Sequence, residues 1–151
     1  MTAAELLSSF GQTLDIDDLE FADNGTCHLI FGDDLEFTIE EVRGENAVYV
    51  FGDVCAVPES DQAGFYARLL DANLFGSGTG DATFAVNKET NTVILHKRIP
   101  LGSLQSEDFQ AQVQEFANWL ITWKSDLAPG DSEEVAGTSE STSDGGEFIR
   151  V

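Results

Sequence analysis

The sequence predicts an α+β fold in which a small antiparallel sheet of about five strands packs with three helices, in the order α-β-β-β-α-β-β-α. Short apolar runs with alternating polarity occur in two groups separated by turn residues, which is typical of strands joined as hairpins. A helix-capping signal opens the chain, and a segment with helical periodicity follows each group of strands. The 151 residues, 42% of them hydrophobic, suffice for one domain with a buried core.

The first half of the chain is expected to form a short helix and a three-stranded meander. Thr2 and Glu5 have the spacing of a capping box, in which each residue satisfies a backbone amide of the first helical turn. Segments containing glycine and asparagine or aspartate then separate three strand-like runs. The expected strands are Thr26 to Phe31, Leu35 to Val42 and Ala47 to Val54.

The next elements are a helix and a hairpin. The helix is expected from Ser60 to about Phe75, with Gly76 as its left-handed C-cap. Strands are expected at Ala82 to Asn87 and Thr92 to Arg98, and Asn91 in the turn between them tolerates a positive φ.

The last helix is expected from Ser106 to Leu127. Its apolar residues recur at steps of three and four, which is the period of a helix that buries one face. Glu107 and Asp108 lie in its first turn and Lys124 in its last, each with the sign that the helix dipole favours.

The composition changes at Ala128, which divides the chain into a domain at 1–127 and a tail at 128–151. The tail is acidic and rich in glycine, serine and threonine, so it has too few apolar residues to offset the entropy of ordering it. We expect a flexible tail. The closing residues, Phe148 to Val151, are either a short docking element or an incidental end, and the incidental end is favoured.

The formal charge of −21 argues against nucleic acid and anionic membranes as partners, because both repel an acidic protein. No window approaches the ~20 apolar residues that span a bilayer, and the N-terminus lacks the basic region of a signal peptide. A cytoplasmic protein is expected. Cys27 and Cys55 lie in apolar runs and are expected to be buried thiols rather than a disulfide or a metal site.

No catalytic or metal-binding pattern is complete. Gly76, Gly78 and Gly80 follow a helix and precede a strand, the reverse of a dinucleotide-binding loop, so they predict a link between the two elements. The acidic run at 15–25 has Glu20 where a calcium loop requires glycine. No enzyme activity, cofactor or metal is expected, and a hydrolase with paired carboxylates remains a minor alternative.

The helix expected at 60–75 is too apolar for one buried face. Its apolar residues cover an arc of about 200°, roughly twice what one core contact needs. Self-association through this helix is favoured, and the alternative is a helix enclosed in its own core. The strand at 47–54 also carries large apolar residues on both faces, and exposed apolar patches mark interaction sites.

A resemblance to a known family rests on the second half of the chain. The segment LLDANLFGSGTGDATFAVNKETNTVILHKRIPL, at 69–101, and the following FANWLITWKSDL closely resemble the class I type III secretion chaperones, the Tir-chaperone family. The likeness covers about residues 1–127. It is most specific at Leu69, Leu70 and Asn73, in the glycine loop, and at Pro100 and Leu101 before the last helix.

The resemblance implies a non-enzymatic homodimer that binds the N-terminal segment of a secreted effector in extended form and delivers it to the secretion apparatus. It also implies two sets of site residues. The dimer interface would comprise Phe65, Leu69, Ala72, Asn73 and Phe84. The effector-binding patches would comprise Leu6, Phe10, Leu29, Phe31, Phe37 and Ile39. An acidic adaptor or regulatory protein-binding module of a secretion system is the alternative.

Overall fold

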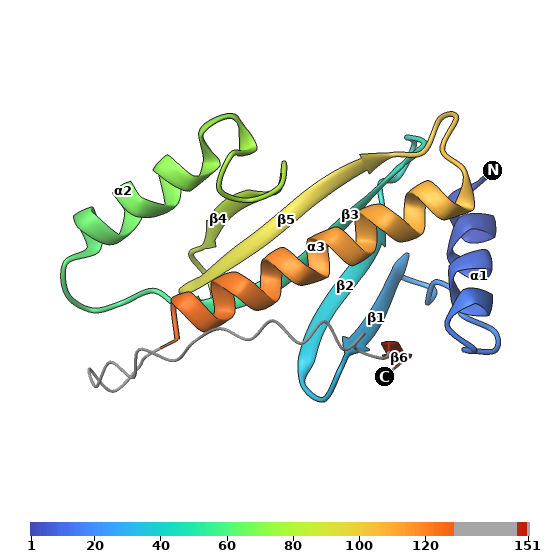
Figure 1. Cartoon of the computed structure of the whole chain (residues 1–151), viewed down its shortest axis with the longest axis horizontal. Helices are drawn as coiled ribbons and strands as arrows, with labels where there is room; N and C mark the ends of the chain where they lie inside the picture. Colours follow the sequence, from blue (N-terminus) through green and yellow to red (C-terminus); the bar gives the residue numbers. More distant parts are fainter. Residues whose placement is uncertain (129–147, 151) are drawn as a thin grey trace, which may run out of the picture.

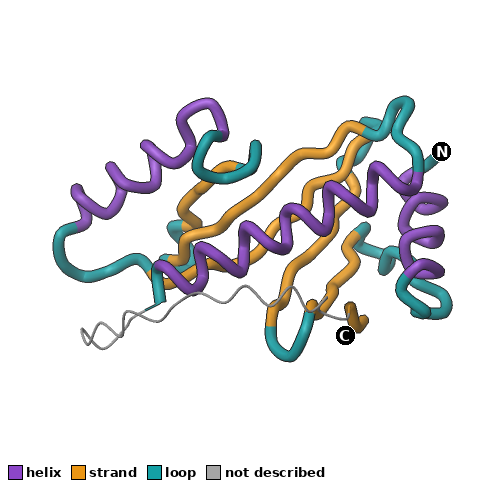
Figure 2. Tube along the Cα trace, in the orientation of Figure 1, coloured by secondary structure: helices purple, strands orange, loops and turns teal. Residues whose placement is uncertain are grey.

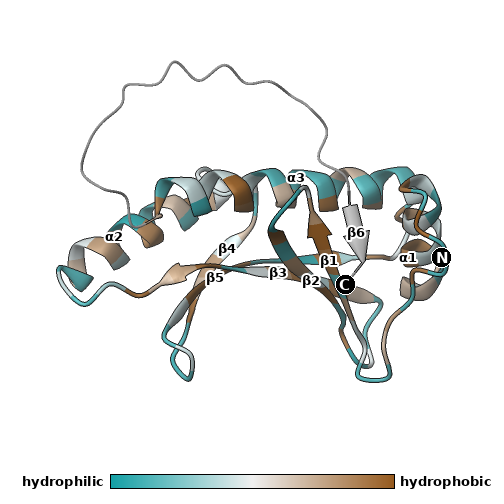
Figure 3. Ribbon diagram, turned by 90° about the horizontal axis from the view of Figure 1, so that it is seen from below, coloured by the Kyte–Doolittle hydropathy of each residue, from teal (hydrophilic) through white to brown (hydrophobic). Residues whose placement is uncertain are grey.

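Six antiparallel strands form one sheet, the long last helix lies over one of its faces, and the two shorter helices lie at opposite ends of the molecule (Figure 3). The computed structural model describes residues 1–128 and 148–150. The order of elements predicted from the sequence is confirmed, with five of the strands where they were expected. The opposite face of the sheet is left without a helix in the described part of the chain, which makes the fold one-sided.

The sheet has the strand order β4-β5-β3-β2-β1-β6. Strands β5 and β3 are both interior strands and form its longest pair (Figure 1). Pairing between β2 and β3 extends only from Thr38 opposite Phe51 to Glu41 opposite Val48, so the two strands separate beyond Phe51. The strands are β1 (Thr26–Phe31), β2 (Leu35–Glu41), β3 (Ala47–Ala56), β4 (Thr83–Asn87), β5 (Thr92–Pro100) and β6 (Phe148–Arg150).

Helix α1 (Ala3–Thr13) begins with the predicted capping box. The Glu5 amide donates to Thr2 Oγ1 at 3.2 Å, and the Thr2 amide donates to Glu5 Oε2 at 2.7 Å. The bond from the Thr2 amide, and after it the Thr2 side chain, favours the ionised carboxylate and lowers the pKa of Glu5. The helix buries Leu6 and Phe10, and the Phe10 ring meets Phe109 of the last helix edge to face, with centroids 5.9 Å apart.

Helix α3 (Ser106–Asp126) runs diagonally along the sheet and buries the predicted stripe (Figure 2). The Phe116 ring packs on Phe37 of β2. Leu120 lies over Gly52 of β3, where a Cβ would come within 2.6 Å of Leu120 Cδ2. The absence of a side chain at Gly52 therefore lets the helix approach the sheet closely.

Helix α2 (Gln62–Asn73) is shorter than predicted at both ends. A 3₁₀ turn, η1 (Leu74–Gly76), follows it. Phe75 adopts φ 54°, which no α-helix accommodates, so the helix ends before Phe75 rather than after it. Gly76 has the positive φ expected of it, at 67°. The predicted left-handed stop is thus correct in kind but starts at the preceding residue.

Strand β6 was not expected, because an incidental end was favoured for these residues. Phe148, Ile149 and Arg150 pair with Phe31, Ile30 and Leu29 of β1, and extend the sheet beyond its predicted five strands. The rest of the predicted tail, apart from Ala128, lies outside the described residues.

Candidate protein-interaction surfaces

The glycine-rich link between α2 and β4 is packed by tryptophans of α3. Trp123 Nε1 donates to the Gly78 carbonyl at 2.9 Å, and the Gly78 amide donates to the Ala72 carbonyl at 3.0 Å. At Gly80, a Cβ would lie 2.1 Å from Trp119 Nε1, so only glycine fits beneath that ring. This geometry agrees with the prediction that the glycines form a link between a helix and a strand, because they permit close packing against α3.

An apolar surface extends over α2, η1 and β4. Leu70, Leu74 and Phe75 are 67%, 55% and 93% exposed, although large apolar side chains are normally buried. Beside them lies a cavity of about 710 Å³ between α2 and β4. We call this region the α2–β4 surface, comprising Leu70, Leu74 and Phe75 with the cavity residues Tyr66, Leu69, Asn73, Phe84 and Val86.

Three of the five expected dimer residues line this cavity. Leu69 and Phe84 form its buried floor, and Asn73 connects α2 to β4. Ala72 is buried and Phe65 is half-buried against the core, and neither lines the cavity. The most exposed members were not among the expected residues. Leu70 and Leu74 belong to the wide apolar arc that the helical wheel shows, whereas the exposure of Phe75 depends on its left-handed backbone.

The helix-free face of the sheet carries a second apolar group. Tyr49 and Phe51 of β3 lie beside Ile94 and His96 of β5, and they line a shallow hollow of about 410 Å³. The rings of Tyr49 and His96 meet edge to face, with centroids 5.9 Å apart. Burial lowers the pKa of His96 and so favours the neutral form of the imidazole. We call these four residues the open sheet face.

The six residues expected to bind an effector all lie in the core, with exposed fractions of 6% or less. They hold α1, β1 and β2 against α3, as the contact between Phe37 and Phe116 illustrates. The sequence pattern identified the apolar side of each element, and that side faces the helices. They therefore form no exposed patch in this structure. The residues are Leu6, Phe10, Leu29, Phe31, Phe37 and Ile39.

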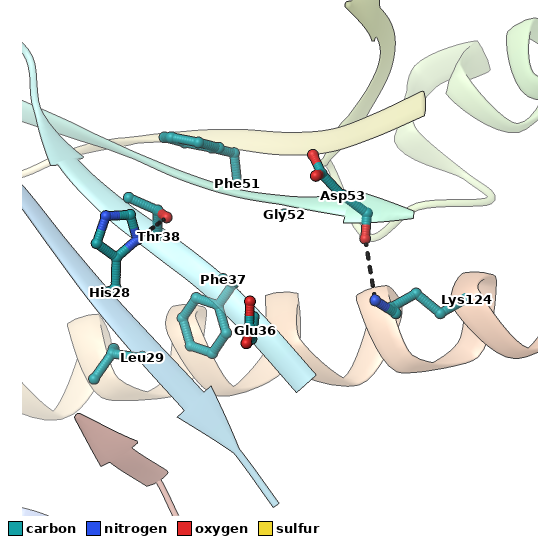
Figure 4. A pocket seen from close by; sticks show the side chains of 9 residues that line it. All are labelled: His28, Leu29, Glu36, Phe37, Thr38, Phe51, Gly52, Asp53 and Lys124. Atoms are coloured by element: carbon teal, nitrogen blue, oxygen red, sulfur yellow. Dashed lines mark hydrogen bonds between the residues drawn. The ribbon is translucent and has the colours of Figure 1, made fainter. Parts of the chain in front are cut away.

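A cleft of about 520 Å³ opens where β2 separates from β3 (Figure 4). Glu36 and Asp53 are among the residues that line it, and Lys124 Nζ of α3 donates to the Asp53 carbonyl at 3.4 Å. His28 Nδ1 and Thr38 Oγ1 are 2.8 Å apart at its other end. Beyond Phe51 the two strands are not paired with each other, and residues of both line the cleft.

Side chains suited to metal binding do not gather in the described residues. Within 1–128 and 148–150, no group of three or more histidine, cysteine, aspartate or glutamate residues could hold a metal ion. Cys27 is buried and Cys55 half-buried, both as thiols, and burial raises the pKa of the Cys55 thiol. Among the helices of the same residues, none has the length and apolar character needed to cross a membrane.

The fold and these surfaces define a class: small one-sided α+β proteins that present apolar surface and sheet edges to other polypeptides. The chain belongs to the Tir chaperone protein (CesT) family, whose family model matches residues 5–124. The match spans α1 through most of α3 and so includes every surface described above.

Individual relatives agree with this family. A Chlamydia pneumoniae protein designated CPj0713/CpB0740 is 32% identical over 89 residues, which cover 58% of this chain and 67% of the relative. A chain of the ExsC–ExsE complex has the same fold, with a TM-score of 0.72 and 19% identity over 87% of this chain and all of that one. A chain from the complex of the Yersinia pestis type III secretion chaperone SycH with a fragment of YscM2 has a TM-score of 0.64 and 15% identity, over 81% of this chain and 99% of that one.

Proposed function

We propose that this protein is a cytoplasmic type III secretion chaperone that binds the N-terminal segment of a secreted effector in extended form and keeps it competent for secretion. The observation that carries the proposal is the match of residues 5–124 to the Tir chaperone family. The related structures include a type III secretion chaperone bound to a fragment of another protein. No catalytic step is part of this function, and secretion apparatus components are proposed as later partners.

An extended segment has two means of binding here. Its backbone can add to a sheet edge, and its apolar side chains can rest on the open sheet face. The formal charge of −21 favours a client with basic rather than acidic residues around its apolar anchors. We therefore propose a client segment in which apolar residues alternate with neutral or basic ones.

The client-binding region is proposed on α1, β1 and β2, with the open sheet face beside them. Leu6, Phe10, Leu29, Phe31, Phe37 and Ile39 build these elements from within. Because the six are buried, direct contacts with a client come from their accessible neighbours. Tyr49, at 37%, is the most exposed of the large apolar side chains on the open sheet face.

A homodimer through the α2–β4 surface is also proposed. The support is the exposure of Leu70, Leu74 and Phe75 beside the cavity that Leu69, Asn73 and Phe84 line, because contiguous apolar surface of this kind is typical of interfaces. Ordering an unfolded client costs several kcal/mol, and a dimer offers it twice the contact area. Phe65 and Ala72 support this surface from the side of α2.

Co-expression with N-terminal segments of proteins secreted by the native host tests the function. The expected result is a complex in which one such segment resists protease and stays soluble only with its chaperone. Tyr49→Glu is expected to weaken capture at least several-fold, while Ile121→Glu, at an exposed position of α3, is not. If the protein binds only a folded partner, and binding is lost when that partner unfolds, the result would contradict the proposal and favour the adaptor alternative.

A further inference from the structure

The outer edge of β1 is occupied by the chain's own C-terminal residues. Strand β6 (Phe148–Arg150) pairs antiparallel with Leu29, Ile30 and Phe31, and is the last strand of the sheet on that side (Figure 1). The two paired strands are far apart in the sequence, since β1 precedes β6 by more than one hundred residues. Without β6, β1 would present an open edge of the kind to which an extended peptide adds.

Only part of that edge is available for pairing. The Glu41 amide of β2 donates to the Gly25 carbonyl, so by strand alternation the backbone groups of Thr26, His28 and Ile30 face away from β2. The Thr26 carbonyl already accepts from the Ala22 amide at 2.8 Å. The accessible positions are therefore His28 and Ile30, and β6 places Ile149 directly opposite Ile30.

On the far side of the sheet, a side chain closes the outer edge of β4 at one residue, Phe84. The Asn73 amide group bonds to both the amide and the carbonyl of Phe84, on the side of β4 that faces away from β5. Strand β4 is thus blocked at Phe84, whereas the edge of β1 offers both His28 and Ile30, and β6 pairs there.

We propose that Phe148–Arg150 is a built-in occupant of the edge where the client strand adds, so that a client must displace it. This inference rests on the proposed chaperone function. The segment has the chemistry inferred for the client, since Phe148 and Ile149 are apolar and Arg150 is basic, whereas residues 128–147 contain acids and no lysine or arginine. The tail therefore ends in a client-like strand.

The geometry makes this occupant displaceable. Strand β6 spans three residues of β1, which is six residues long, so a client strand that also reaches His28 forms more backbone hydrogen bonds. Because β6 belongs to the same chain, its pairing does not depend on protein concentration. If the edge is open roughly a tenth of the time, the apparent affinity for a client is reduced about tenfold.

Amide hydrogen exchange tests the occupancy without any client. We expect the Ile30 amide to exchange faster in a chain that ends at Glu147 than in the full chain. Ile149→Pro should have the same effect, because proline lacks the amide opposite Ile30, while Thr142→Pro should not. Equal exchange in the full and shortened chains would overturn the proposal. Protection that disappears on dilution would also overturn it, since the strand would then come from a second copy.

A labelled peptide of residues 146–151 tests the site itself. It is expected to bind the shortened chain and to bind the full chain about tenfold more weakly, because the full chain already holds this segment. Equal binding to both chains would contradict occupancy of the edge.

A binding experiment with a client segment distinguishes this inference from the function on which it rests. An effector segment captured in the co-expression test should bind the shortened chain about tenfold more tightly than the full chain. Equal affinity for the two chains would overturn the displacement and leave the chaperone function intact. Failure of every candidate segment to bind either chain would overturn the function and with it the regulation, although hydrogen exchange would still decide the pairing of β6.

Discussion

Asn73, the last residue of α2, makes with its side-chain amide both hydrogen bonds that a neighbouring strand would make with Phe84. The Phe84 amide donates to Asn73 Oδ1 at 2.7 Å, and Asn73 Nδ2 donates to the Phe84 carbonyl at 3.2 Å. One side chain thus joins the helix to the sheet and closes the outer edge of β4 at Phe84. It also fixes the position of the α2–β4 surface.

Replacing Asn73 by alanine should therefore lower the free energy of unfolding by about 1–3 kcal/mol, because both backbone groups of Phe84 lose their partner. Urea denaturation measures the change. Asn118→Ala is the matched control, since its side-chain oxygen accepts only a long hydrogen bond from Gln114, at 3.5 Å. An equal loss in the two variants would show that the bonds to Phe84 contribute nothing particular.

Leu70→Asp should convert the proposed dimer to a monomer without unfolding it. Leu70 is 67% exposed, so a carboxylate there is solvated in the single chain but buried in an interface. Leu69 is a poor test, because it is buried and aspartate at that position would destabilise the fold. Light scattering after size exclusion measures the mass, and Ile121→Asp on α3 should keep the wild-type mass. A dimeric Leu70→Asp would remove the α2–β4 surface from the interface.

Gly52→Ala should destabilise the fold by about 1–3 kcal/mol through overpacking, because its Cβ would lie 2.6 Å from Leu120 Cδ2 and 3.2 Å from the Glu36 carbonyl. Thermal denaturation measures the loss. Gly102→Ala is the matched control, since no atom beyond its own chain neighbours lies within 4 Å of the Cβ it would introduce. If both variants melt together, α3 does not pack on β3 as closely as described.

The half-buried His96 should make stability depend on pH. Burial lowers its pKa below the ordinary value of 6.5, so the unfolded chain binds a proton more readily than the folded one. The contribution of His96 to the free energy of unfolding therefore falls as the pH falls through 6.5. His96→Gln is the control, because the wild type and this variant contain the same carboxylates, and the pH dependence that those carboxylates cause is common to both proteins.

Urea denaturation at about pH 7.5 and about pH 5.5 measures the difference. The wild type should lose more stability, or gain less, than His96→Gln over this range. Identical changes would mean that the imidazole is as well solvated in the folded chain as in the unfolded one.

Much of the fold follows from local patterns that the sequence contains in full. The capping box of Thr2 and Glu5 and the apolar stripe of α3 depend on residues within a few positions of one another. Both features can therefore be predicted from the sequence alone. The wide apolar arc of α2 could be predicted for the same reason. The family was recognisable because the motif around Leu69 and Asn73 is compact in sequence.

The candidate surfaces depended on tertiary structure. Leu29 and Phe37 have the same apolar pattern whether they face solvent or a helix, and only the position of α3 shows that they are buried. Phe75 became exposed because its backbone turns left-handed after α2.

By itself, the sequence determined the order of elements, the acidic charge and the surplus of apolar residues, because these depend on composition and short-range periodicity. The tertiary structure alone decided which apolar residues stay outside and that Ile149 lies opposite Ile30. The physical reason is that strand pairing and burial join residues far apart in the chain, and no local pattern specifies which distant partner is reached.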